Sequence, residues 1–158
     1  MKTKVSILFA LMVASAAVAR WAELPLEKVV RQSHVVVIGE ITNITVAPPP
    51  EEIDQYQFDV ADITVQEVLL NTLTNQVIKP KQELPLSMPS IRNNVQISTD
   101  IRYKIGSKGI WILEFRDKTF WATYPKDFQP MSAEKEVRAI TRKLNEEPSN
   151  QAIDSNKE

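Results

Sequence analysis

The chain has 158 residues, with 19 basic and 20 acidic side chains, one histidine and 43% hydrophobic residues. This length and composition are ordinary for one globular domain, and they exclude collagen-like, extensively disordered and multi-span membrane proteins. Because the chain has no cysteine, disulfide frameworks, thiolate catalysis, cysteine zinc sites and iron–sulfur clusters are excluded as well.

The first 19 residues have the pattern of a secretory signal peptide. Lys2 and Lys4 precede an apolar run over 5–13, and small residues lead to Ala19, which fits a cleavage site. We expect removal of residues 1–19, no membrane span afterwards, and a secreted or periplasmic product. Cleavage would leave 17 basic against 20 acidic residues. Since this gives no basic excess to hold phosphates, nucleic acid is not an expected partner.

The remaining chain is predicted to form one β-rich domain over 20–146, followed by a disordered tail over 147–158. Hydrophobic periodicity and turn residues define its elements. In chain order we predict a helix over 25–32, long strands over 34–46 and 56–69, a short strand over 83–88, a hairpin over 110–124 and a helix over 132–145.

The two long strands carry irregular patterns. Apolar residues of both parities open the strand over 34–46, which predicts burial on both faces, and Gly39 indicates a bulge or bend there. In the following strand the apolar side is predicted to switch parity between Val60 and Ile63, as at a bulge. In the short strand, Pro85 suits only an edge or a bulge.

The hairpin is the clearest element of the sequence. With Asp117 and Lys118 as its two turn residues, Arg116 lies opposite Thr119, and alternate residues of the two strands share one apolar face. Burial of that face is expected to provide the core. Its members are Trp111, Leu113, Phe115, Phe120, Ala122 and Tyr124.

This order predicts a mainly β domain with flanking helices, built as a small curled antiparallel sheet or barrel. The stretches SHVVVIGEIT, YQFDV…VQEVLL and IGSKGIWIL resemble netrin-like domains and tissue inhibitors of metalloproteinases over about 24–124. The resemblance implies an OB-like barrel of five strands. Members of the inhibitor family chelate zinc through an N-terminal cysteine, which this chain lacks, so neither that mechanism nor any family site residue carries over.

Few residues offer catalytic chemistry. His34 is the only imidazole, and its place at the start of a valine-rich strand favours a structural role. Asp59 and Asp62 have opposite parity in their strand, so they are not expected to form a catalytic pair. An acidic cluster after the triple proline fits a solvated turn and lacks the spaced donors of a calcium loop; it consists of Glu51, Glu52 and Asp54. We predict no cofactor and no metal.

The candidate ligand site is Trp121 with Glu114 and Thr123, which share one face of the predicted hairpin. Trp121 is expected either to pack beneath the terminal helix, at Val137, Ile140 and Leu144, or to be open to a ligand; the first alternative is favoured.

For function, these features favour an exported, non-enzymatic accessory or binding domain that acts on an envelope protein or a glycan. The alternative is a small carboxylate-dependent hydrolase or hydrolase subunit. Clustered Asp and Glu side chains in one cleft would favour the enzyme, whereas a shallow aromatic or apolar patch would favour the binding domain.

Overall fold

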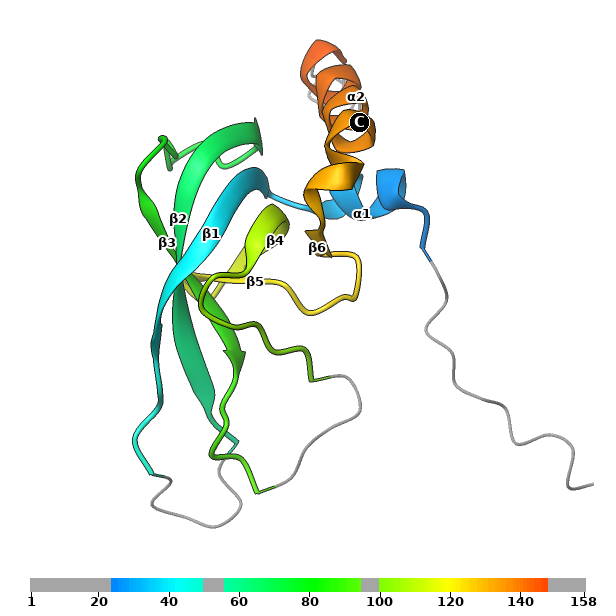
Figure 1. The fold of residues 1–158 in the computed structure, drawn as a ribbon. Helices are drawn as coiled ribbons and strands as arrows, with labels where there is room; N and C mark the ends of the chain where they lie inside the picture. Colours follow the sequence, from blue (N-terminus) through cyan, green and yellow to red (C-terminus); the bar gives the residue numbers. More distant parts are fainter. Residues whose placement is uncertain (1–23, 50–55, 95–99, 148–158) are drawn as a thin grey trace, which may run out of the picture.

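A computed structural model describes residues 24–49, 56–94 and 100–147, which form a small β-barrel with two helices beside it (Figure 1). The predicted signal peptide over 1–19 and the acidic cluster over 51–54 lie outside these ranges. So does the predicted tail beyond residue 147.

Every predicted helix and strand is present, and only β6 is absent from the sequence prediction. The elements are α1 (Leu26–Gln32), β1 (Val35–Thr45), β2 (Phe58–Asn71), β3 (Glu83–Pro89), β4 (Lys108–Arg116), β5 (Thr119–Trp121), β6 (Phe128–Gln129), a 3₁₀ turn (Met131–Ala133) and α2 (Glu134–Glu146).

The strands close into a barrel of five strands in the order β1-β2-β3-β5-β4, with β4 pairing back onto β1. Neighbours are antiparallel except β3 and β5, which run parallel and meet only at Leu86 with Phe120 and at Ser87 with Trp121. This topology confirms the predicted mainly β fold, a small OB-like barrel with flanking helices.

The first half of β1 is buried on both faces, as the pattern over 34–46 predicts, and so is most of β4. One set of their side chains fills the barrel, and the alternate set packs outward against α1 and α2. Figure 1 shows both helices on this one side of the molecule. The inward set is Val35, Val37, Trp111 and Leu113, and the outward set is Val36, Ile38, Ile110 and Ile112.

Gly39 lies at a register shift between β1 and β2, which confirms the predicted bend. A Cβ atom at this position would lie 2.8 Å from both the Ile63 Cγ2 atom and the Thr64 carbonyl oxygen. The two backbones approach so closely here that no larger residue fits without a shift.

The predicted parity switch between Val60 and Ile63 is wrong. Asp59 points inward with Ile63, whereas Phe58 and Val60 are exposed on the outer face. The inward side changes parity at Gln66 instead, where the pairing with β1 skips a residue, so that Val65 and Val68 both face the interior. The prediction failed because the apolar residues Phe58 and Val60 were taken as the buried side, whereas Asp59 occupies that side.

The hairpin register is confirmed near its turn, where Arg116 pairs with Thr119. The ladder ends at Trp121, so the predicted hairpin does not extend to Tyr124, and Trp111 pairs with Phe128 of β6. Tyr124 packs instead with the cluster beneath the helices. A turn held by a carboxylate, described below, redirects the chain between β5 and β6.

Candidate functional site

Two hollows divide the predicted ligand residues between them. Trp121 lines a groove of about 560 Å³, and Glu114 lines a separate pocket of about 180 Å³. Thr123 borders both hollows. The three residues predicted as one site therefore lie on two sides of the segment that follows β5.

The larger hollow, called the Phe58 groove below, lies on the outer face of β2, β3 and β5. Its walls include the first part of β2, the end of β3 and the β4–β5 turn. The residues that line it include Tyr56, Phe58, Pro89, Ile101, Arg116 and Trp121.

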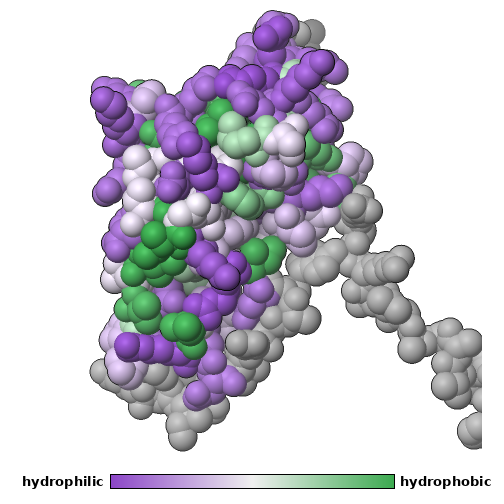
Figure 2. Space-filling model, viewed as in Figure 1, coloured by the Kyte–Doolittle hydropathy of each residue, from purple (hydrophilic) through white to green (hydrophobic). Residues whose placement is uncertain are grey.

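This end of the barrel is unusually apolar on its surface. Figure 2 shows hydrophobic residues gathered over the lower half of the visible face, where β1 ends. Val46 follows β1, Phe58 and Val60 open β2, and Ile91 follows β3; all four side chains are exposed. Exposed apolar residues that gather in this way are typical of interaction surfaces.

Trp121 is buried, with 9% of its surface exposed, but the terminal helix does not cover it. The Phe58 ring meets it edge-on at a centroid distance of 5.0 Å, and the Arg116 Cζ atom lies 4.4 Å from the indole centroid. Trp121 was expected to pack under α2, and this expectation is wrong. α2 packs on the outer cluster around β1 and β4, whereas Trp121 packs against Phe58 of β2.

Phe58 is the open aromatic residue of the groove, with 43% of its surface exposed. Its ring also contacts Tyr56, at a centroid distance of 5.3 Å. Sequence reasoning missed Phe58 because the parity switch assigned it to the core. The local pattern gave the opposite signal, because the alternation of Phe58 and Val60 with Asp59 favours an inward apolar side and an exposed carboxylate, the reverse of what the structure has.

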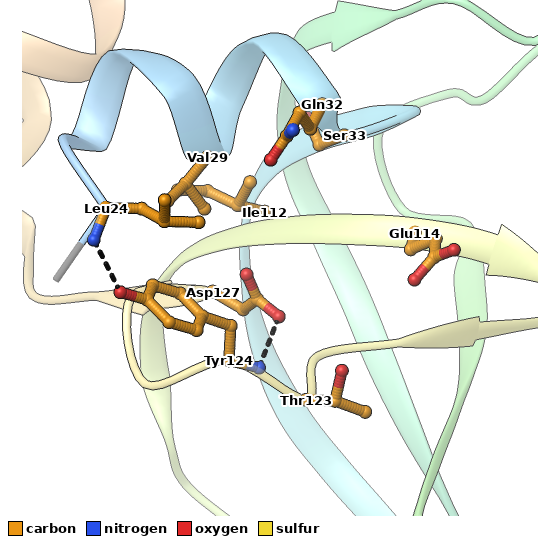
Figure 3. A pocket seen from close by; sticks show the side chains of 9 residues that line it. All are labelled: Leu24, Val29, Gln32, Ser33, Ile112, Glu114, Thr123, Tyr124 and Asp127. Atoms are coloured by element: carbon orange, nitrogen blue, oxygen red, sulfur yellow. Dashed lines mark hydrogen bonds between the residues drawn. The ribbon is translucent and has the colours of Figure 1, made fainter. Parts of the chain in front are cut away.

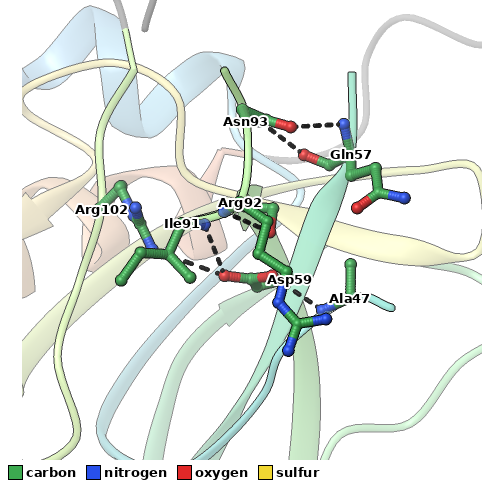
Figure 4. Close-up of polar contacts among 8 residues, drawn as sticks. Ala47, Gln57, Asp59, Ile91, Arg92, Asn93 and Arg102 are labelled. Atoms are coloured by element: carbon green, nitrogen blue, oxygen red, sulfur yellow. Dashed lines mark hydrogen bonds and ion pairs between the residues drawn. The ribbon is translucent and has the colours of Figure 1, made fainter. Parts of the chain in front are cut away.

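Asp59 connects the segments that carry Ala47, Ile91 and Arg102 at this end of the barrel (Figure 4). Its side chain is fully buried and accepts hydrogen bonds from the backbone N–H groups of Ala47 at 2.9 Å and Ile91 at 3.1 Å. Arg102 approaches at 3.5 Å. Burial alone would raise the pKa of Asp59, but hydrogen bonds from Ser90 and the two backbone N–H groups, with the Arg102 charge, lower it overall.

Tyr56 is fixed at the groove wall by Asp100, to which its hydroxyl donates a hydrogen bond at 2.5 Å. Burial and this carboxylate raise the pKa of Tyr56 to about 12. The hydroxyl therefore stays protonated and serves as a donor, not as a base.

The smaller hollow, called the Asp127 pocket, lies between α1 and β4 (Figure 3). Asp127 accepts a hydrogen bond from the Tyr124 N–H at 2.7 Å, and the Tyr124 hydroxyl accepts one from the Leu24 N–H at 2.9 Å. Burial raises the pKa of Asp127 to about 6, and the nearby Glu114 charge adds to the rise. Hydrogen bonds from the backbone N–H groups of Tyr124 and Thr123 lower the pKa but do not outweigh burial. Asp127 was not among the predicted site residues.

The other candidate residues have structural roles. The His34 Nδ1 atom accepts a hydrogen bond from the Phe115 N–H at 3.1 Å, and its carbonyl accepts one from the Thr72 N–H at 2.9 Å. Asp59 and Asp62 lie on opposite faces of β2, as expected, and Asp62 accepts a hydrogen bond from Asn43 at 2.9 Å.

Within the described ranges, no group of three or more His, Cys, Asp or Glu side chains is placed to hold a metal ion. No helix in this part of the chain is long and apolar enough to cross a membrane. No protein-family model and no curated protein matches the sequence. The fold, the Phe58 groove and the Asp127 pocket are the features that bear on function.

Proposed function

We propose that the chain is an exported, non-enzymatic binding domain and that the Phe58 groove is its binding site, with an envelope protein or a glycan as the partner. The observation that supports this most is Phe58, which is 43% exposed although it contacts the buried Trp121. A large aromatic side chain left half open beside a buried one is a typical anchor for a ligand.

The size and place of the groove support it over the Asp127 pocket. Its volume of about 560 Å³ falls within the range of roughly 300–1,000 Å³ found for ligand sites. Five-stranded barrels of this topology also use the face of their second and third strands for binding. That analogy supports the position of the site and not the identity of the ligand.

Binding is tested by probing peptide and glycan arrays with the purified protein. Phe58→Ala is expected to weaken any binding by about tenfold or more. Val77→Ala is the matched control, since Val77 is 74% exposed in the loop at the other end of β2 and lies outside the groove lining. Ligands retained by Phe58→Ala, or arrays without a ligand for the wild type, would contradict the proposal.

Export rests on the pattern of the first 19 residues. An intact-mass measurement on the exported protein tests it, with the expected product beginning at Arg20. A product that keeps Met1 would contradict this part of the proposal.

The alternative of a carboxylate-dependent hydrolase is supported by one observation. Asp127, with its raised pKa, shares a pocket with Glu114, and unequal carboxyl groups can divide the roles of acid and base. Binding is preferred because backbone N–H groups already occupy the Asp127 carboxylate. Hydrolysis of chromogenic esters or glycosides that disappears in Asp127→Asn would reverse this preference.

A further inference from the structure

Arg116 is held against the floor of the Phe58 groove by two contacts with one residue. Its guanidinium lies over the Trp121 ring, with 4.4 Å between Cζ and the ring centroid. The Trp121 Nε1–H group also donates a hydrogen bond to the Arg116 carbonyl at 3.3 Å. Strand pairing and the cation–π contact together place the guanidinium before any ligand arrives.

Within the described residues Arg116 has no side-chain hydrogen bond and no ion pair. By contrast, Arg31, Arg102 and Arg138 each pair with a carboxylate. Because a guanidinium carries its N–H groups in its own plane, the contact with the indole leaves those donors available at its edge.

We propose that the Phe58 groove recognises a carboxylate carried beside an apolar side chain, as at the C-terminus of a peptide, and that Arg116 binds this carboxylate. The inference rests on the proposed function and specifies the ligand chemistry of the same site. A planar guanidinium matches a carboxylate through two parallel hydrogen bonds, and Phe58, Pro89 and Ile101 supply apolar contacts beside it.

The acidic residues of the groove differ in their effect on such a ligand. Asp100 accepts the Tyr56 hydroxyl, which partly satisfies its charge. Asp117 follows Arg116 in the β4–β5 turn, is exposed and lines the same groove, so it opposes an incoming carboxylate. Removal of the Asp117 charge should therefore raise the affinity for a carboxylate ligand, whereas removal of the Arg116 charge should lower it.

The ring geometry favours a peptide over a sugar as the source of the carboxylate. Sugars commonly lie flat on open aromatic faces. Here the Trp121 face is covered by Arg116, and the Phe58 ring stands at 81° to the indole and at 67° to the Tyr56 ring. These edge-to-face rings provide an apolar recess for a side chain instead of a stacking platform.

The test titrates the purified protein with N-acetyl-alanyl-leucine and, separately, with the same peptide as its C-terminal amide. Binding is followed by the indole N–H signals in NMR spectra, assigned by the loss of one signal in Trp121→Phe. The Trp111 indole donates to the Gly39 carbonyl inside the barrel and is the internal control. We expect the acid to shift the Trp121 signal alone and to bind about tenfold more tightly than the amide.

Three variants assign the effect to residues. Arg116→Gln should reduce the affinity for the acid to that for the amide. Lys118→Gln, which also removes one positive charge but lies outside the groove lining, should leave it unchanged. Asp117→Asn should tighten binding of the acid by a few-fold.

The outcomes separate the two proposals. Equal affinities for acid and amide, or an unchanged affinity in Arg116→Gln, would overturn carboxylate recognition and leave the groove as a binding site. Tighter binding of glucuronate than of the peptide acid, with glucose as its neutral control, would overturn the peptide source. If neither peptide binds while an array ligand depends on Phe58, only this inference fails; if no ligand is found at all, the proposed function fails with it.

Discussion

The two outer faces of the barrel are built from similar strands but differ in whether helices cover them. The β1–β4 face is covered by α1 and α2, and its apolar residues Val36, Ile38, Ile110 and Ile112 are buried. α2 also packs on the second half of β2, through Leu69, Leu70 and the Arg138–Glu67 ion pair. Within the described residues, no helix covers the outer face formed by the first part of β2 with β3 and β5, where Phe58 and Val60 stay exposed. The comparison teaches that both helices, one from each end of the domain, stabilise a single face and leave apolar side chains of the other exposed.

Two carboxylates, the buried Asp59 and the half-buried Asp127, have pKa values that are shifted in opposite directions. Asp59, at the open end of the barrel, has a lowered pKa because its hydrogen bonds and Arg102 outweigh its burial. Asp127, beneath α1, has a raised pKa because burial outweighs its two backbone bonds. One carboxylate is thus stabilised in its charged form and the other is not, so their effects on stability should depend on pH in opposite directions.

The largest expected effect compares the barrel interior with the helix-covered face. Leu113→Ala and Ile112→Ala change neighbouring β4 residues that point to opposite sides, and both side chains are almost fully buried. Each substitution should lower the free energy of unfolding by about 2–5 kcal/mol, measured by chemical denaturation. An Ile112→Ala loss far below the Leu113→Ala loss would show that the helices pack loosely and that the two sides of β4 are not equivalent.

The next effect concerns the open end of the barrel. Asp59→Asn keeps the size of the side chain but removes the charge that accepts hydrogen bonds from Ala47, Ile91 and Ser90, and it should lower stability by about 1–3 kcal/mol at neutral pH. Because the folded pKa lies below the ordinary value of 3.8, the wild type should lose this stabilisation as the pH falls below about 4. Denaturation midpoints measured downward from pH 7 should therefore converge for the two proteins; parallel curves would refute the assignment.

Sequence patterns predicted the barrel well where local chemistry decides, as in the continuously apolar strand β4 and the turn at Asp117. They failed where a polar group is satisfied by distant partners. Asp59 could be placed inside the barrel only with knowledge of Ala47 and Ile91, which lie 12 and 32 residues away, and this error carried Phe58 into the predicted core.

The candidate site shows the same limit. Trp121 was placed on the correct side of the hairpin, opposite Glu114. Its cover by Phe58 and Arg116 depends on the β2–β3–β5 arrangement, in which strands distant in sequence meet through a parallel contact of two residue pairs. No local pattern in the sequence encodes that contact, so the groove itself was not predictable.

Asp127 should give the opposite pH dependence and a smaller effect. Its pKa rises from 3.8 to about 6 on folding, so the folded state binds a proton more tightly than the unfolded state between these values. Its contribution to stability is therefore present below about pH 4 and is lost as the pH rises to about 6. The full shift corresponds to about 3 kcal/mol, which solvent screening of this half-buried group should reduce to about 1 kcal/mol. Asp127→Asn can still accept the Tyr124 N–H, and its unfolding free energy should lack this decline. A decline of equal size in wild type and variant would assign it to another group.

The smallest effect lies in the turn that joins the covered strand β4 to the open strand β5. Asp117 and Lys118 have φ angles of 52° and 64°, in the left-handed region where a side chain is strained and glycine is not. Lys118→Gly creates the Asp-Gly pair preferred in such two-residue hairpin turns and should raise the free energy of unfolding by about 0.5–1 kcal/mol. Lys108→Gly is the matched control because it removes the same exposed side chain from β4 itself, where added backbone freedom should lower stability. Since Lys118 does not line the Phe58 groove, ligand binding should stay unchanged while stability rises. A Lys118→Gly protein that is less stable than wild type would show that the lysine side chain, and not the turn geometry, supports this junction between the two faces.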